Sequence, residues 1–138
     1  MTEPVIAKEQ AEVEFDQWVD AMDIDANESE MDQEDLTEYK KVKGRIIRAI
    51  MSGSLTFNED GEAVYKTQNQ KSGDQKTVTF FEVDGAALMA SDYRKANHNV
   101  SKMFAIMTAM CKTNQQVFSV MKGADIKLCI AITKLLMD

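Results

Sequence analysis

A run of oxygen-bearing side chains between two predicted helices has the spacing of a calcium-binding loop. Positions one, three, five, seven and twelve of that loop hold Asp23, Asp25, Asn27, Ser29 and Glu34. Hard oxygen ligands at this spacing are what Ca²⁺ prefers. The sixth position, however, needs glycine for its sharp turn and holds Glu28, and the eighth, normally aliphatic, holds Glu30. Because an acidic linker easily produces the same spacing and no second loop occurs, we favour a solvated linker and expect no metal.

The sequence lacks the sets of residues that form a catalytic triad, a zinc site or a phosphate-binding loop. His98 is the single histidine, and no G-x-S-x-G elbow accompanies it. Cys111 and Cys129 with one histidine cannot complete a four-ligand zinc site, and each lies on an apolar helix face as a small hydrophobe. The six glycines never form a phosphate-binding motif. We therefore expect a protein that is not an enzyme and that carries no cofactor.

Charge is distributed unevenly along the 138 residues, whose net charge is −7. Residues 1–38 hold fourteen carboxylates and one lysine, a net charge of −13, whereas residues 39–138 carry a net charge of +6. This acidic arm either shields a basic face of its own chain, meets a basic partner, or only keeps the protein soluble. The basic residues of 40–48 surround their helix without interleaved aromatics, so we expect no binding to nucleic acid.

The chain lacks the composition of a membrane-spanning or secretory segment. Its apolar runs fall short of the ~18 residues that cross a bilayer. Met1–Lys8 lacks the basic-then-apolar pattern of a signal peptide. We therefore expect a soluble protein of a reducing compartment, with no membrane partner and no structural disulfide.

Two amphipathic helices are predicted at the N-terminal end. Apolar residues at three- and four-residue spacing indicate a helix from Glu9 to Met22, whose Trp18 we expect to be buried against the body or against a partner. The same spacing indicates a longer helix from Leu36 to Ile50.

Strands are predicted in the middle of the chain. Leu55–Phe57 and Ala63–Tyr65 flank the turn sequence Asn58–Gly61 and predict a β-hairpin. Residues 66–76 have no apolar side chain and predict a loop, and the β-branched and aromatic residues of Thr77–Phe81 predict a third strand.

Helices are predicted over the remainder. They comprise a short helix capped by Asp84, a helix over 99–112, a short helix that begins after Asn114 and ends at Gly123, and a last helix capped by Asp125. The predicted fold class is α+β: a small antiparallel sheet, made of the hairpin plus one strand, packed against a C-terminal helical layer, with two N-terminal helices. We expect residues 1–35 to form an acidic arm with one amphipathic helix and residues 36–138 to form a single α+β domain.

Methionine is the most informative residue type in this chain, with ten copies. Its side chain is unbranched and polarizable, so a surface built from it can re-pack around different partners. Each methionine can equally fill the core, since apolar helix faces pack inward more often than they form grooves. The candidate partner-binding residues are Trp18, Met103, Phe104, Met107, Met110, Phe118 and Met121.

Two segments share their order of elements with a known family. TVTFFEVDGAALMASD (Thr77–Asp92) combines a strand, a polar break and a short helix. Met107–Met137 combines a helix with small residues, a short helix, an aspartate at position 125, and a last helix that closes on the apolar pair Leu135 and Leu136. Both segments resemble the bacteriophage tail assembly chaperone family, small proteins that are encoded ahead of the tape measure protein in long-tailed phages.

The resemblance covers about Leu55–Met137, and residues 1–50 have no clear counterpart. The sequence differs from the family's pattern at Cys111-Lys112-Thr113, where members of the family often have Thr-Gly. The resemblance implies a non-enzymatic protein of the host cytoplasm that binds tape measure protein, tail tube protein or both before the tail polymerises. Two other interpretations stay open: a structural virion subunit of a phage tail or neck, and an acidic decoy that binds a basic nucleic-acid-binding protein through residues 1–38. Self-association is also open.

Overall fold

The computed structural model describes residues 6–24, 27–67, 77–82, 85, 99–113, 115–119, 121 and 123–137, without the side chains of 99–102 and 115. The helices are α1 (Lys8–Ala21), the 3₁₀ helix η1 (Glu28–Glu30), α2 (Gln33–Met51), α4 (Asn99–Met110), α5 (Gln115–Ser119) and α6 (Gly123–Leu136). The strands are β1 (Leu55–Phe57), β2 (Ala63–Lys66) and β3 (Thr77–Phe80). The predicted α+β class, with two N-terminal helices, a small antiparallel sheet and C-terminal helices, is confirmed.

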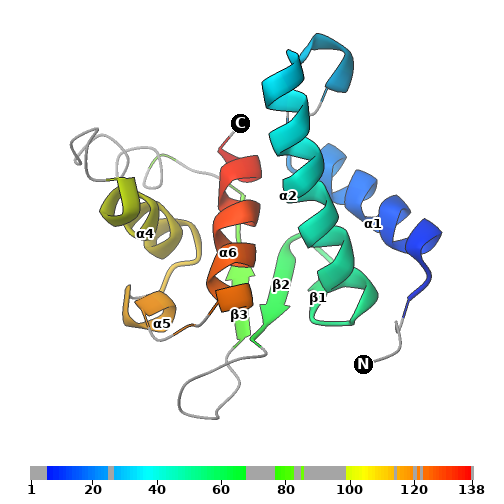
Figure 1. Cartoon of the computed structure of the whole chain (residues 1–138). Helices are drawn as coiled ribbons and strands as arrows, with labels where there is room; N and C mark the ends of the chain where they lie inside the picture. Colours follow the sequence, from blue (N-terminus) through cyan, green and yellow to red (C-terminus); the bar gives the residue numbers. More distant parts are fainter. Residues whose placement is uncertain are drawn as a thin grey trace.

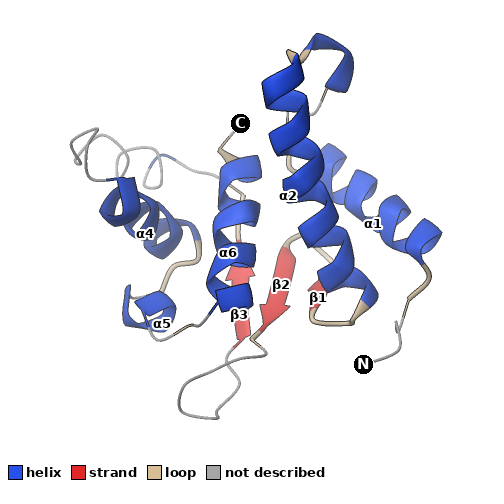
Figure 2. Ribbon diagram, viewed as in Figure 1, coloured by secondary structure: helices blue, strands red, loops and turns tan. Residues whose placement is uncertain are grey.

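Helices α2 and α6 lie side by side at the centre of the molecule (Figure 1). Helix α1 packs on α2 at one side, and α4 packs on α6 at the other, with α5 against α4. The strands lie behind α2 and α6 in this view (Figure 2). Helix α2 also contacts β1, so the two central helices together connect the sheet to the outer helices.

The sheet has the order β1-β2-β3, with every neighbouring pair antiparallel. Leu55 lies opposite Tyr65, and Val64 lies opposite Thr79. Tyr65, Val78 and Phe80 are buried, whereas the residues that alternate with them are partly or fully exposed. Such alternation is typical of an antiparallel sheet that has one covered face.

The hairpin turn explains the register of β1 and β2. The Oδ1 atom of Asn58 accepts hydrogen bonds from the backbone N–H groups of Asp60, at 3.0 Å, and Glu62, at 2.9 Å. Gly61 adopts a φ of +80°, which glycine reaches without steric cost. The predicted hairpin is therefore confirmed, and its turn chemistry is that of an Asx turn.

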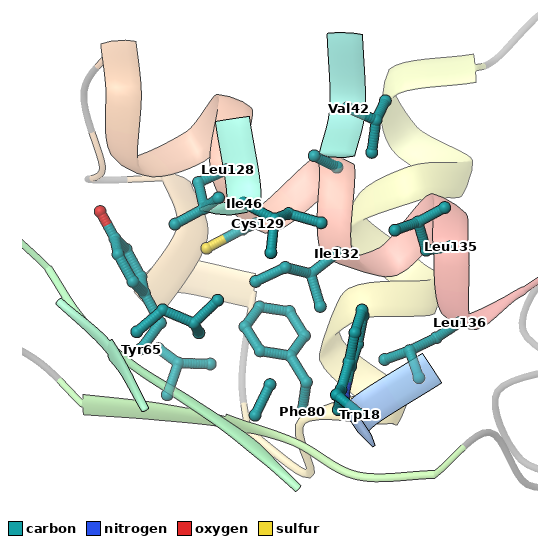
Figure 3. Close-up of a cluster of buried hydrophobic side chains, with 14 of the residues drawn as sticks. Trp18, Val42, Ile46, Tyr65, Phe80, Leu128, Cys129, Ile132, Leu135 and Leu136 are labelled. Carbon is teal, nitrogen blue, oxygen red and sulfur yellow. The ribbon is translucent and has the colours of Figure 1, made fainter. Parts of the chain in front are cut away.

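One hydrophobic cluster joins the elements (Figure 3). It includes Phe15 and Trp18 of α1, Ile46 of α2, Phe80 of β3 and Ile132 of α6. All of these side chains are at most 2% exposed. Helix α1 thus packs into the same core as the sheet and α6.

Two helix starts differ from the sequence prediction. Helix α2 begins at Gln33, earlier than Leu36, because Asp32 caps it: its Oδ1 accepts a hydrogen bond of 2.8 Å from the backbone N–H of Asp35. Helix α6 begins at Gly123, so Asp125 lies inside its first turn and is not the capping residue. The start of α2 was missed because its first turn is polar and shows no apolar periodicity. The carboxylate of Asp125 accepts a hydrogen bond from a residue far away in the sequence, which is described below.

Several predictions fall largely or wholly outside the residues that the structure describes. They are the loop at 66–76, the short helix after Asp84, the Asn114 cap, His98, and part of the Thr77–Asp92 segment that carries the family resemblance. These remain predictions from the sequence.

Candidate partner-binding groove

A groove of about 590 Å³ lies between α2, α4 and α6, next to the end of the chain. We call it the methionine groove. It is lined by Met31, Asp35, Glu38, Tyr39, Val42, Met103, Ile106, Lys134, Leu135 and Met137. Its three methionines come from three separate parts of the sequence and converge only in the folded chain.

Helical spacing places these side chains on facing surfaces. On α2, Asp35, Glu38 and Val42 are separated by three and four residues, which puts them on one side of the helix. On α4, Met103 and Ile106 are three residues apart and share a face for the same reason. The start of α2 lies beside the end of α6, so residues of both helices line the same groove.

The interior of the groove is apolar, and its charged groups lie at the rim. Tyr39, Ile106 and Leu135 are buried at its base, whereas the three methionines are half-buried. Because a methionine side chain has three rotatable bonds and a polarizable sulfur, such walls adapt to different apolar surfaces. The site therefore suits an apolar side chain of a partner and offers few groups for polar chemistry.

One ion pair crosses the rim between α2 and α6. The Nζ atom of Lys134 lies 3.9 Å from Oε1 of Glu38, and the two side chains are 50% and 58% exposed. An exposed pair at this distance contributes little to stability because water and salt screen it. It can therefore open for a partner at low cost.

The seven candidate residues from the sequence are divided between the groove and the core. Met103 lines the groove, and Phe104 is half-buried on the same helix. The other five are buried, with at most 8% of any side chain exposed: Trp18, Met107, Met110, Phe118 and Met121. For these five the structure shows core packing, and a role in binding a partner stays a prediction.

Trp18 packs inside the body of the protein. Its ring centroid lies 6.0 Å from that of Phe15 and 6.1 Å from that of Phe57, both in tilted arrangements. The side chain is 2% exposed. Of the two sequence-based alternatives for Trp18, burial against the body is the one observed.

The groove residues that sequence analysis missed include Met31, Tyr39, Ile106, Leu135 and Met137. Met31 carried a signal that could have been used, because it is an isolated apolar side chain in the acidic stretch before α2. The other four were indistinguishable from core positions, since they follow the same helical periodicity as their buried neighbours.

Of the residues with calcium-like spacing, Asn27 acts as a helix cap in the structure. The Oδ1 atom of Asn27 accepts hydrogen bonds from the backbone N–H of Ser29, at 3.2 Å, and from its hydroxyl, at 2.7 Å, at the start of η1. Glu34 lies in the first turn of α2, and Asp25 is outside the described residues. Within the described part of the chain, no three His, Cys, Asp or Glu side chains are grouped so as to hold a metal ion.

A buried polar pair fastens the sheet to α6. The hydroxyl of Tyr65 on β2 donates a hydrogen bond to Oδ1 of Asp125, which is completely buried. Burial raises the pKa of Tyr65 well above its usual 10.0, and the hydrogen bond and charge of Asp125 raise it further. Tyr65 therefore stays protonated and acts as a hydrogen-bond donor.

Both cysteines are buried thiols. Burial raises the pKa of Cys111 from 9.0 to about 12. Burial also raises the pKa of Cys129, with further contributions from nearby Cys111 and Asp125. Since the thiolate is the reactive form, neither thiol has the environment of a nucleophile.

Comparison of the chain with known protein families, curated proteins and solved structures gives no match. Among the described helices, none is both long and apolar enough to span a bilayer.

Replacing Tyr65 with phenylalanine tests the buried pair. Because Asp125 stays buried but loses this donor, we expect the free energy of unfolding to fall by about 1–3 kcal/mol in urea titrations. Tyr39→Phe is the control: Tyr39 is also buried, but its hydroxyl forms no hydrogen bond with the described residues, so a change below about 0.5 kcal/mol is expected. Equal effects of the two substitutions would contradict this role of Tyr65.

The raised pKa of Cys111 predicts destabilisation by alkali. The folded state holds the thiol proton more tightly than the unfolded state, so the associated stability is complete below pH 9.0 and is lost as the pH rises towards about 12. Urea unfolding under reducing conditions between pH 8 and 11 should show a decline, to which this thiol contributes up to about 1.4 kcal/mol per pH unit. Cys111→Ala should flatten the decline, and an unchanged slope would count against burial as its cause.

Proposed function

We propose that this protein is a non-enzymatic phage tail assembly chaperone that binds an apolar helical segment of a tape measure protein, a tail tube protein or both before the tail polymerises. The methionine groove is the observation that supports this proposal best. An assembly chaperone needs an adaptable apolar surface for a client that would otherwise aggregate. The family resemblance over about Leu55–Met137 supplies the identity of the client and a place of action in the host cytoplasm.

The exposed surface supports a localised binding site. Val13 on α1, 48% exposed, is the one large hydrophobic side chain that is highly exposed among the described residues. The remaining accessible apolar surface is held in partly buried side chains, such as those of the groove. A net charge of −7 favours solubility, while the half-buried methionines of the groove offer an adaptable apolar surface to a partner.

The shape of the site favours a helix as its occupant. The groove is bordered by three helices, and its polar groups, Asp35, Glu38 and Lys134, are at the edge. A pocket for a small polar ligand would instead place convergent hydrogen-bonding groups inside. An amphipathic helix that lays its apolar face between helices matches the observed arrangement.

Acidic substitutions in the groove test the proposal. In Met103→Glu/Met137→Glu, two apolar walls become charged, and we expect client affinity to fall at least about tenfold. Co-expression with the tape measure protein, followed by pull-down and measurement of its soluble fraction, gives the readout. Val13→Glu introduces the same chemical change at an exposed site on α1 and should leave the complex intact. No complex with the wild-type protein, or equal capture by the groove variant, would overturn the proposal.

Mass spectrometry of purified virions separates the chaperone from a structural subunit of a tail or neck. A chaperone should be missing from the finished particle, whereas a subunit should be present at a fixed copy number. A virion that contains the protein in stoichiometric amounts would favour the subunit.

An acidic decoy is the second candidate, and one observation favours it. The carboxylate side chains of η1 and of the first turn of α2 are exposed on one continuous stretch of the chain: Glu28, Glu30, Glu34 and Asp35. This function would show as salt-sensitive binding to a basic nucleic-acid-binding protein, unaffected by the substitutions at Met103 and Met137.

A further inference from the structure

A second hollow, of about 210 Å³, continues the methionine groove along α2 and α6. We call it the basic furrow. Its lining residues are Glu38, Lys41, Val42, Arg45, Lys127, Ile130, Ala131 and Lys134. Since Glu38, Val42 and Lys134 line both hollows, the two form one continuous surface along α2 and α6.

The furrow has cationic walls and an apolar floor. Lys41 and Arg45 come from α2, and Lys127 comes from α6. The floor consists of Val42, which is 9% exposed, with Ala131 and Ile130. Beyond Arg45, a further hollow at the start of α6 contains Arg48, so the positive charge extends along the later turns of α2.

The positive charges of the furrow are not neutralised within the described part of the chain. Only Lys134 forms an ion pair there, with Glu38. Lys41, Arg45 and Lys127 have no carboxylate of a described residue within ion-pairing distance. Three like charges that border one narrow hollow repel each other, and an anionic occupant would relieve this repulsion.

The charge of the surface reverses along its length. The end at the start of α2 carries Asp35 and Glu38, whereas the other end carries Arg45 and Lys127. Lys134 and Lys127 are seven residues apart on α6, which corresponds to about 10 Å along the helix axis. A helix that binds over both hollows would therefore meet apolar walls first and cations about two turns further on.

From this polarity we infer that the partner helix carries acidic side chains about two turns from its apolar anchor, and that Lys41, Arg45 and Lys127 bind these carboxylates. The inference rests on the proposed function, because it assigns the chemistry and the direction of the helix that binds in the methionine groove. An acidic peptide fits better than nucleic acid, since the furrow has no aromatic side chain on which a base could stack.

Two synthetic helical peptides provide the probe. Both carry the same leucine-rich face, and one carries four glutamates near one end where the other carries glutamines. By isothermal titration calorimetry at low salt, the full-length wild-type protein should bind the glutamate peptide at least tenfold more tightly. The difference should shrink as salt is added, because the added contacts are ionic.

Charge reversal in the furrow should remove the preference. In Lys41→Glu/Lys127→Glu both positions are exposed, and we expect the two peptides to bind equally, at about the affinity of the glutamine peptide for wild type. Lys8→Glu/Lys40→Glu makes the same change in net charge at two exposed lysines that line neither hollow, and it should retain the preference.

The outcomes separate this inference from the proposed function. One outcome is that both peptides bind wild type with equal affinity and neither binds the groove variant Met103→Glu/Met137→Glu. The inferred role of the basic furrow is then overturned, while the proposed role of the methionine groove is supported. Another outcome is that the preference for the glutamate peptide persists in the groove variant but disappears in the furrow variant. The inferred role of the furrow is then supported, and the proposed role of the groove is overturned. Failure of both peptides to bind wild type overturns both. Two results would reassign the furrow to another occupant and overturn the inference: tighter binding of a single-stranded oligonucleotide, or wild-type self-association that the furrow variant abolishes.

Discussion

Burial of α6 against the sheet, α2 and α4 is the constraint on which the rest of the structure depends. Eight of its fourteen residues are buried. An ordinary surface helix hides one stripe, whereas a helix with neighbours on several sides must be apolar over most of its circumference. Even its buried threonine is satisfied locally, since the hydroxyl of Thr133 donates a hydrogen bond of 2.8 Å to the backbone oxygen of Cys129.

The surface proposed for binding follows from that burial. With so much of α6 covered, its accessible side chains are few, and they include Lys127, Ile130 and Lys134 next to α2. Near the last turn of α6, the groove beside α2 and α4 is lined by Met31, Met103 and Met137. The same packing that stabilises the fold thus determines where apolar surface stays accessible.

The sequence was sufficient to predict the helices and strands that are specified by residues close to one another in the chain. The hairpin was predictable because Asn58 and Gly61 supply the turn within four residues, and α1 and α2 because their apolar periodicity is long. The partner of Asp125 was not predictable, since Tyr65 lies sixty residues earlier in the chain and nothing in either neighbourhood marks the pairing. Asp125 therefore looked like a helix cap, which is the common local use of that residue.

Core and surface methionines could not be separated from sequence for a related reason. Met103 and Met107 lie one turn apart on α4 and share a helix face, yet Met107 is completely buried while Met103 lines the groove. What separates them is how far the neighbouring elements, α6 above all, cover each position of α4. That coverage is set by tertiary packing, and no property of either residue encodes it.

The charge pattern along α2 and α6 goes beyond what helix stability requires. Acidic residues in the first turn of α2 and Arg48 in its last turn match the helix dipole, and so do Asp125 and Lys134 on α6. The dipole, however, acts mainly within a single turn of each end. Lys41 and Arg45 lie in the middle of α2, and Lys127 lies near the start of α6, where a cation gains nothing from the dipole. Their alignment along one hollow, without carboxylate partners among the described residues, is therefore not accounted for by the dipole of either helix, and it is the observation from which an acidic partner is inferred.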